Sequence, residues 1–555
     1  MSLPIKTVIP RLTVSRAQRL LAAGAISSED LVQYCHALAV AGEEQWHLNA
    51  FVYIQDRMDL VLQARDLDDR RRSGEPIGVL NGIPVSVKAN LAVSDVALTA
   101  GSKILGSEAI GTPLCGYDAH VVKKLRDSGA LIIGSTNMDE FGMGSLGTNA
   151  AASKFNGSKA TRNPLPLFRH CVIQTDAELI DIIQRPYDAI IEDHIRSNEC
   201  DLSFSAGGSS CGSAASVAHG SSLISLGSDT GGSVRLPASW CGVVGFKPSY
   251  GVLSRHGLVS YASSLDTVGI FGSSVSCVAI ACDQIRNKEN ENSRDSTASI
   301  TSFEEYVGTI DGHLSLAGIK IGIPAAFSVE EAPTCVLDAW LAAAEHLQSL
   351  KATIVELSPS QLSPELIQNS LPAYYALASA EASSNLSRYD GMRYGVSAKD
   401  ISDRSNMTLL ERQYSATRAQ GFGIEVIRRI LCGTSVLSSD RFHTFYEAAA
   451  TLRAELTQEL NSCFDDVDFL LTPTALSLPP SLVDHAIIDP TEMFANDIMT
   501  VPISLAGLPA ISVPTSSSPD GVFSFGMQLI GSRLSEGKLL QVAQVLDHRD
   551  DIKKG

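Results

Sequence analysis

The 555-residue sequence lacks three features that would assign it to well-known classes of protein. It has no uninterrupted run of about 18 apolar residues, so a membrane-spanning helix is not expected. Its 11 cysteines run from Cys35 to Cys463 without CxxC pairs, which argues against a zinc site and favours a reducing compartment. Excess positive charge is also missing. The net charge of −18 argues against this chain alone gripping a nucleic acid.

Acidic residues are absent before Glu29, although basic residues do occur there, at Lys6, Arg11, Arg16 and Arg19. This pattern is typical of an organelle transit peptide, and we expect residues 1–13 to serve in targeting to the mitochondrial matrix, the alternative being a cytoplasmic protein. Residues 14–25 are instead interpreted as the first helix of the mature domain. A second helix is predicted to follow, with Ser27 and Asp30 forming its capping box.

Short apolar segments alternate with helical segments along the chain. We predict a helix that is capped by Asp118 and ended by Gly129. Strands are predicted at residues 83–87, 130–133, 242–246, 319–323, 469–471 and 510–513. Such a mixture indicates an α/β layer architecture. The polar segment 284–299 is predicted to be a linker between a front half and a back half.

Residues 203–233 are unusually rich in serine and glycine, which is compatible with a flexible linker. Apolar residues such as Ala214, Val217 and Leu223 are spaced regularly among them, however. A free linker has no use for that spacing. We therefore interpret the segment as tightly packed, with backbones in close approach.

Two short motifs in the sequence match known patterns but lack the necessary context. Residues 142–147 fit GxGxxG, yet they follow no strand pattern and lack the acidic residue that a dinucleotide site requires. Residues 229–231 and 127–129 could mimic the two aspartates of an aspartic protease. Nothing in the sequence brings those carboxylates close enough to share a proton.

A third motif stays open as a competing mechanism. Residues 208–212 fit GxSxG, the nucleophile elbow of α/β-hydrolases, which would make Ser210 the nucleophile. That mechanism also needs a downstream acid and histidine, for which His443 or His485 is available.

The segment GSDTGGSVR, Gly227–Arg235, has the composition of a loop whose backbone N–H groups converge on one point, and no histidine lies near it. Lys88, at the end of the apolar segment GIPVSVK, could replace histidine as the base. Burial lowers a lysine pKa from its usual value of about 10.4 because the charged form is desolvated. A snorkelling or ion-paired Lys88 is the other interpretation.

A serine hydroxyl both donates and accepts, so Ser209 could pass a proton from Ser233 to Lys88. Ser233 would then be the nucleophile of an acyl transfer. The backbone N–H groups before it, on Thr230, Gly231 and Gly232, could stabilise a developing oxyanion.

Taken together, GIPVSVK, GGSS and GSDTGGS resemble the amidase signature family. The match runs from about residue 76 to 283 and resumes after the predicted linker. The resemblance implies Lys88 as base, Ser209 as bridging serine and Ser233 as nucleophile, and no metal. It also implies a single α/β domain over 14–548, with a large mixed central β-sheet covered by helices on both faces.

Within that family, the likeness is strongest to the A subunits of glutamyl-tRNA(Gln) amidotransferases. It rests on the blocks TAGSKIL, TNMDEFGMGS, SRHGLVSYASSLDTVG, EASSNLSRYDGMRYG and MFANDIMTVPISLAGLPAISVP. The resemblance implies glutamine hydrolysis, with Arg429 holding the substrate's carboxylate, Asp497 its amino group and Tyr374 lining the site; Arg428 is the alternative to Arg429. It also implies a B subunit that holds ATP, Mg²⁺ and Glu-tRNA(Gln), and a small third subunit.

Two other functions remain open: a free-standing hydrolase of small amides with the same triad, and an inactive amidase-like scaffold. The sequence departs from the family at Ala89, where aspartate is usual, at Cys211, where glycine is usual, and in the long segment 165–204. That segment is interpreted either as a surface insertion or as an error in the gene model. A true insertion would end near Ser209 and could perturb it.

Overall fold

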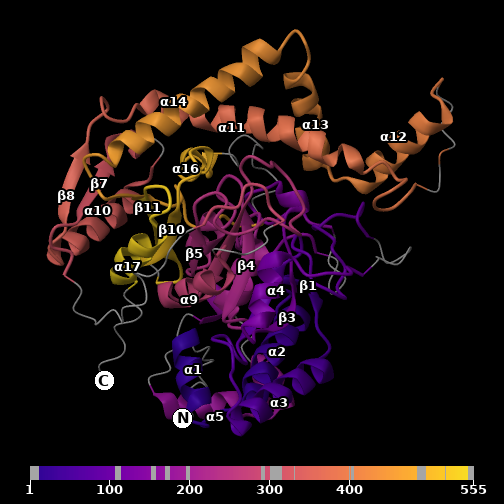
Figure 1. The fold of residues 1–555 in the computed structure, drawn as a ribbon, viewed down its shortest axis with the longest axis vertical. Helices are drawn as coiled ribbons and strands as arrows, with labels where there is room; N and C mark the ends of the chain where they lie inside the picture. The colour runs from indigo at the N-terminus through magenta and orange to yellow at the C-terminus, as the bar shows by residue number, and fades with distance from the viewer. Residues whose placement is uncertain are drawn as a thin grey trace.

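Eleven strands form one mixed sheet in the computed structural model of this chain (Figure 1). In sheet order they are β1, β3, β2, β4, β6, β5, β10, β11, β9, β7 and β8. The structure describes residues 12–106, 114–151, 158–168, 175–195, 201–288, 294–300, 315–329, 332–398, 401, 406–483, 495–518 and 521–547.

Both halves of the chain contribute strands to this sheet. The strands are β1 Phe51–Ile54, β2 Pro84–Lys88, β3 Leu131–Thr136, β4 Ile224–Asp229, β5 Val244–Lys247, β6 Thr267–Gly272, β7 Lys320–Pro324, β8 Thr353–Leu357, β9 Phe469–Pro473, β10 Ala510–Ser517 and β11 Ser524–Gly531. Strand β2 pairs in parallel with β3 and β4, whereas β4 pairs antiparallel with β6. Strands β2 and β4 are completely buried, and they end side by side at Lys88 and Asp229.

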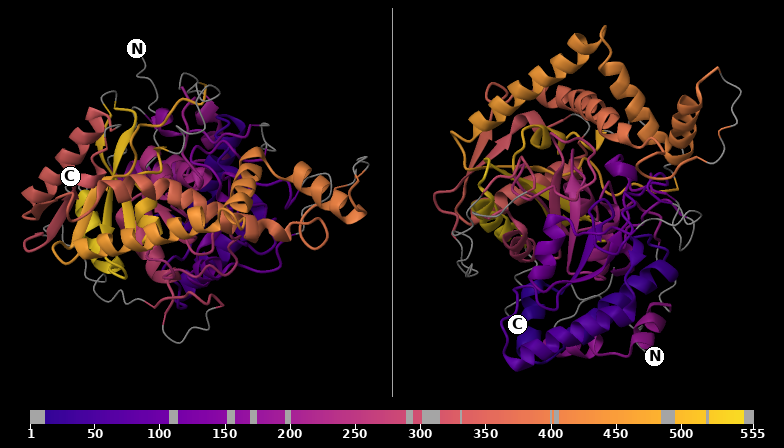
Figure 2. Two further views of the ribbon diagram at one scale, coloured as in Figure 1. Left: turned by 90° about the horizontal axis from the view of Figure 1, so that it is seen from above. Right: turned by 45° about the vertical axis from the view of Figure 1, so that its right-hand side comes forward.

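Helices pack against the sheet along its length, so the predicted α/β class is confirmed. They are α1 Val14–Ala22, α2 Ser28–Glu44, α3 Arg57–Ser73, α4 His120–Asp127, α5 Asp176–Ile183, α6 Tyr187–Ile195, α7 Cys211–His219, α8 Arg235–Trp240, α9 Val275–Ile285, α10 Thr334–Ser349, α11 Pro364–Asn385, α12 Leu409–Gly421, α13 Ile424–Val436, α14 Ala448–Cys463, α16 Val501–Leu505 and α17 Glu536–Leu546. The N-terminal helices α1–α3 lie at one end of the molecule and α11–α14 at the other (Figures 1 and 2).

Most elements predicted from the sequence are present. Every predicted strand has a counterpart, and the Ser27–Asp30 capping box is formed in both directions. The predicted cap at Asp118 is wrong: α4 begins after Ala119, and the Asp118 carboxylate instead accepts a hydrogen bond from Ser94 N and pairs with Arg126.

The prediction that GSDTGGSVR is entirely a loop is also wrong. Gly227–Asp229 complete strand β4, and Arg235 begins α8. The reason is close packing. A Cβ on Gly227 would lie 2.7 Å from the Phe271 ring of the neighbouring strand, so glycine is required inside the sheet at this position.

The segment 165–204 contains two helices, α5 and α6, that pack against α2. Leu179, Ile183 and Ile190 are buried there. The Tyr187 hydroxyl lies 2.8 Å from His36 Nδ1, and Asp176 pairs with Arg16 at 2.7 Å. These contacts place the hairpin on the N-terminal helices (Figure 1).

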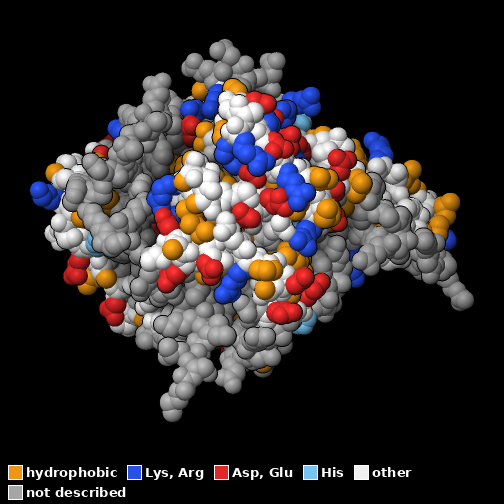
Figure 3. Space-filling view, turned by 90° about the horizontal axis from the view of Figure 1, so that it is seen from below, with side chains coloured by type: hydrophobic (Ala, Val, Ile, Leu, Met, Phe, Trp, Pro, Cys, Tyr) orange, Lys and Arg blue, Asp and Glu red, His pale blue; other side chains and the backbone are white. Residues whose placement is uncertain are grey.

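Acidic and basic side chains are interspersed over the face at this end of the molecule (Figure 3). Residues 1–11 of the predicted targeting segment lie outside the described residues, and Thr13 caps α1. Within the polar segment 284–299, the described residues Asn287 and Asp295 are bonded to the body of the protein. Across the described ranges, no helix has the length and apolarity needed to cross a membrane.

Candidate active site

Lys88 is the last residue of β2, and its side chain is fully buried. Its Nζ lies 2.9 Å from Ser209 Oγ, 2.8 Å from Ser210 Oγ and 2.9 Å from Ser228 Oγ. Because burial disfavours the ammonium form, the pKa of Lys88 falls to about 8. The snorkelling interpretation is therefore wrong, and the amine sits among hydroxyl groups.

Hydrogen bonds around Lys88 set the direction of proton donation. Ser210 Oγ donates to the Ser228 carbonyl at 3.1 Å, so this hydroxyl can only accept from Lys88. Asn90 Nδ2 donates to Ser228 Oγ at 3.0 Å. A neutral amine can therefore donate its two N–H groups towards Ser210 and Ser228. Its lone pair is then directed to the Ser209 hydroxyl.

Ser209 and Ser233 are brought together by the backbone. Ser210 N donates to the Ser233 carbonyl at 3.2 Å. This bond joins residues 207–210, here called the serine turn, to the loop after β4. The Gly208–Ser209 peptide bond is cis, and the Ser209 carbonyl accepts from Asp139 N at 3.1 Å. Ser209 is 1% exposed and Ser233 is 9% exposed, so Ser233 is the more accessible of the two hydroxyls.

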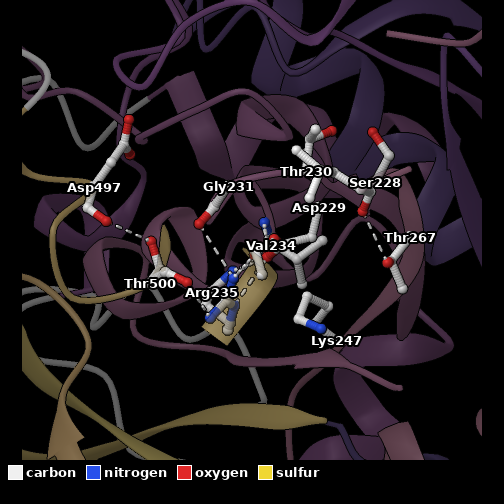
Figure 4. A network of polar contacts seen from close by, with 12 residues as sticks. Ser228, Asp229, Thr230, Gly231, Val234, Arg235, Lys247, Thr267, Asp497 and Thr500 are labelled. Atoms are coloured by element: carbon white, nitrogen blue, oxygen red, sulfur yellow. Dashed lines mark hydrogen bonds and ion pairs between the residues drawn. The ribbon is translucent and has the colours of Figure 1, made fainter. Parts of the chain in front are cut away.

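A fully buried ion pair between Asp229 and Arg235 holds the loop that carries Ser233 (Figure 4). Arg235 donates to both carboxylate oxygens, at 2.9 and 3.1 Å, and to the Gly231 carbonyl at 3.3 Å. Burial raises the pKa of Asp229, but the Arg235 charge outweighs that effect and leaves it below its usual value. The loop is therefore fixed at both ends by one charged pair.

The two glycines before Ser233 leave room for neighbouring side chains. A Cβ on Gly231 would lie 2.8 Å from Tyr374 Cζ, and one on Gly232 would lie 2.0 Å from Thr500 Oγ1. Within the described part of the chain, neither glycine N–H donates to an acceptor. Thr230 is held by a 2.8 Å hydrogen bond from its hydroxyl to Asp266.

Arg429 and Arg428 differ sharply in environment. Arg429 is buried, and it donates to Glu425 Oε1 at 2.8 Å and to the Tyr261 hydroxyl at 2.6 Å. The Arg428 side chain is 48% exposed and pairs with the other oxygen of Glu425. The geometry therefore favours Arg429 as the residue that faces the site.

Asp497 and Arg429 both contact Tyr375. Its Oδ2 accepts from the Tyr375 hydroxyl at 3.0 Å and from Ser145 Oγ at 2.8 Å, while the Arg429 guanidinium lies 5.1 Å from the Tyr375 ring centre. Burial raises the pKa of Asp497. Tyr374 packs edge-on against Tyr375 at 5.1 Å.

Several residues of this site were not identified by sequence reasoning. They are Asn90, Ser145, Ser228, Tyr261, Tyr375 and Glu425. Ser145 and Tyr261 lie inside two of the sequence blocks that carried the family resemblance, so a signal for them was available. Tyr375 follows Tyr374 directly, and Asn90 is two residues after Lys88, but only the fold shows what they contact.

Among the residues that it describes, the structure does not bring together those that the GxSxG and aspartate-pair motifs require. The His443 side chain is 78% exposed on a helical turn, paired with Glu447, and His485 lies outside the described residues. Asp127 forms an exposed pair with Lys123, whereas Asp229 is committed to Arg235. The structure therefore supports neither a histidine-activated Ser210 nor a pair of aspartates.

The sequence departures near the site are accommodated. Cys211 is fully buried, its sulfur accepts from Thr161 Oγ1 at 3.2 Å, and burial raises its pKa to about 12. Ala89 is buried, and its N–H continues the pairing with Thr136.

A buried lysine at the end of β2 lies beside a serine turn and the glycine-rich loop after β4, which is the arrangement that a lysine-activated serine hydrolase of amide bonds requires. The sequence profile of the family named Amidase matches residues 32–171 and 195–540, and the chain belongs to this family. The stretch between the two matched ranges covers most of α5 and α6.

Several similar proteins of known name are A subunits of glutamyl-tRNA(Gln) amidotransferases. The A subunit of the glutamyl-tRNA(Gln) amidotransferase from Carboxydothermus hydrogenoformans is 37% identical over 507 residues, which is 91% of either chain. The corresponding protein of Synechococcus sp. is 36% identical over 98% of either chain. The crystal structure of the Thermotoga maritima counterpart matches with a TM-score of 0.69 and 28% identity, over 99% of this chain and 96% of that one.

Proposed function

We propose that this chain is the glutamine-hydrolysing subunit of a tRNA-dependent amidotransferase. The ammonia it releases serves to convert Glu-tRNA(Gln) to Gln-tRNA(Gln). The observation that carries the proposal is the buried Lys88 amine, 2.9 Å from Ser209 Oγ and with a pKa near 8. The similarity to the named A subunits over nearly the whole chain supports the substrate.

The reaction begins with proton transfer away from Ser233. Neutral Lys88 accepts the proton of Ser209 as Ser209 takes the proton of Ser233. Ser233 Oγ then attacks the side-chain amide carbon of glutamine. The oxyanion that forms accepts hydrogen bonds from the backbone N–H groups of Thr230, Gly231 and Gly232.

Collapse of the tetrahedral intermediate breaks the C–N bond. The proton held on Lys88 returns through Ser209 to the leaving nitrogen, so ammonia departs and a γ-glutamyl ester remains on Ser233. Water then attacks this ester with Lys88 again accepting a proton through Ser209. Glutamate leaves and the Ser233 hydroxyl is restored.

Recognition of glutamine requires one cation and one anion for its α-carboxylate and α-ammonium groups. Arg429 is assigned to the carboxylate because a guanidinium binds carboxylates through two parallel hydrogen bonds. Asp497 is assigned to the ammonium group. Tyr374, whose ring lies against Gly231, is assigned to line the substrate pocket beside the backbone N–H groups that bind the oxyanion.

The rest of the reaction belongs to partner subunits in this proposal. A B subunit binds ATP, Mg²⁺ and Glu-tRNA(Gln), and a small third subunit completes a heterotrimer. The net charge of −18 supports a division in which another chain grips the tRNA. A mitochondrial location is proposed from the acid-free segment before Glu29.

Ammonia release from L-glutamine tests the proposal. The full chain, supplied with Glu-tRNA(Gln) after co-expression with its B subunit, is expected to release ammonia, and Ser233→Ala is expected to release none. Ser349→Ala, at an exposed serine near the end of α10, is the matched control and should retain the full rate. Equal rates for the parent and Ser233→Ala would refute the catalytic assignment. Release from simple amides but not from glutamine would favour the free-standing hydrolase.

A further inference from the structure

Glu140 is a buried carboxylate in the loop after β3, and the mechanism above does not use it. It is 4% exposed. Its Oε2 accepts from Gly423 N at 2.7 Å, and its Oε1 accepts a short hydrogen bond from the Ser102 hydroxyl. Gly423 immediately precedes α13, the helix that carries Glu425 and Arg429. A carboxylate from the front half of the chain therefore caps a helix from the back half.

The contact at Gly423 is closely fitted. No side chain of the local sequence caps α13, so Glu140 supplies the anion that the positive end of a helix attracts. A Cβ on Gly423 would lie 2.3 Å from Glu140 Oε2, and only glycine permits this approach without displacement. The Phe141 ring also packs edge-on against Phe422, at 5.7 Å between ring centres.

The same loop reaches the catalytic serines. Asp139, the residue before Glu140, donates its N–H to the Ser209 carbonyl at 3.1 Å. Two adjacent residues thus hold opposite ends of the site: Asp139 holds the serine turn, and Glu140 holds the start of the helix that presents Arg429.

A cavity of about 230 Å³ adjoins this junction. Its lining includes Glu140, Gly423 and Glu425, together with Lys103 and Lys159. The start of α13 therefore has space to move towards the cavity if its contact with Glu140 is lost. A movement of Glu425 would also shift Arg429, because the two residues form an ion pair. The far part of the helix is held separately, since a Cβ on Gly433 would lie 1.9 Å from the Ser379 carbonyl of α11.

We propose that Glu140 is a positioning residue that fixes the start of α13, and through it Arg429, relative to the serine turn. It thereby sets the affinity of the site for the α-carboxylate of glutamine; this inference rests on the proposed function. Burial raises the pKa of Glu140 to about 7, while the bonds from Ser102 and Gly423 and the charges of Lys159 and Lys103 oppose that rise.

Calorimetric binding of L-glutamine to the full chain in a Ser233→Ala background tests this role without turnover. Glu140→Ala is expected to raise the Kd about tenfold, because a charged hydrogen bond at the helix start is lost. Glu140→Gln should restore most of the affinity, since its amide oxygen can still accept from Gly423 N. Glu411→Ala, which removes a carboxylate from the start of α12, is the matched control and should leave the Kd unchanged.

Gly423→Pro is a second variant for the case in which Glu140→Ala does not fold. The backbone dihedrals at Gly423, φ −74° and ψ 166°, are ones that proline adopts. Proline removes the N–H that donates to Glu140, and its Cβ, which would lie 2.3 Å from Glu140 Oε2, displaces the carboxylate as well, so the contact is broken from the helix side. It should raise the Kd as Glu140→Ala does. In turnover by the otherwise unsubstituted chain, Glu140→Ala should raise the KM for glutamine with little change in kcat. Hydrolysis of 4-aminobutanamide, which is glutamine without its α-carboxylate, should be unaffected.

The outcomes separate this inference from the proposed function. Unchanged glutamine affinity in Glu140→Ala and Gly423→Pro would overturn the positioning role, even if the parent chain hydrolyses glutamine. Equal losses for glutamine and 4-aminobutanamide would overturn it as well, because the effect would then not involve the carboxylate. Absence of glutamine hydrolysis by the parent with its partner would refute the proposed function. Absence of glutamine binding would refute both.

Discussion

Arg429 Nε lies 2.8 Å from Glu425 Oε1, one turn earlier on the same helix. The pairing holds the guanidinium in one orientation inside a buried site. Replacing Arg429 by lysine keeps the charge but loses the planar fork that binds a carboxylate. We expect Arg429→Lys to raise the KM for glutamine by about 30-fold or more, corresponding to about 2 kcal/mol or more of binding. Arg428→Lys is the control, and similar KM values for the two variants would contradict the assignment.

The pH profile of ammonia release should report the titration of Lys88. The amine acts as a base only when neutral, and burial lowers its pKa to about 8. The value of kcat/KM is therefore expected to rise about tenfold per pH unit below 8 and to level off above it. Lys88→Met should remove activity at every pH. A profile that is flat between pH 6 and 9 would exclude Lys88 as the titrating base.

The same pKa shift predicts how stability changes with pH. Unfolded lysine titrates near 10.5, so between about 8 and 10.5 the unfolded chain binds more protons than the folded chain does. The stability of the parent should therefore rise through this window relative to Lys88→Met, whose residue does not titrate. Paired melting curves at pH 7.5 and pH 10 measure the difference in Tm, and a constant difference would show that the folded protein does not lower the pKa of Lys88.

The Asp229–Arg235 pair should contribute far more to stability than a surface pair does. Asp229→Asn leaves a fully buried guanidinium without its counter-charge, which costs about 3–5 kcal/mol. Asp176→Asn, at a carboxylate that is 43% exposed, should cost less than about 1 kcal/mol. Thermal unfolding of both variants provides the comparison. Equal shifts in Tm would mean that the buried pair is not the support for the loop.

The helical hairpin α5–α6 should be separable from catalysis. Leu179 is fully buried in it, and Leu179→Ala should cost about 2–5 kcal/mol of local stability. Because the hairpin contacts α2 rather than the serine turn, ammonia release should be unchanged below the melting temperature. Limited proteolysis within residues 175–195 should become faster. A fall in kcat with the fold retained would show that the hairpin does act on the site.

The sequence predicts those parts of the site whose residues are neighbours in the chain. Lys88 could be placed at a strand end because the residues before it are apolar and β-branched, and the serine and glycine motifs lie within one segment. The partners of these residues come from distant segments, so Tyr375 beside Asp497 and Glu140 beside Gly423 have no local signal.

Strands β4 and β6, which are interrupted by glycine, also escaped prediction. Glycine has low strand propensity. Glycine is present at position 269 because a Cβ there would lie 2.7 Å from the Val234 side chain, a constraint set by packing rather than by local preference.

Three of the groups that hold Arg235 are supplied by Thr500, Ser504 and Gln528, which lie 265 to 293 positions further along the chain. A growing polypeptide therefore cannot supply all the hydrogen-bond acceptors of Arg235 until nearly the whole chain has left the ribosome. Any chain that terminates before residue 500 keeps the Asp229 partner of Arg235 but lacks these three acceptors, so part of this buried guanidinium has no hydrogen-bond partner. Premature termination or a late frameshift should thus yield an inert product that proteases remove, and hydrolysis should begin only once synthesis is essentially finished.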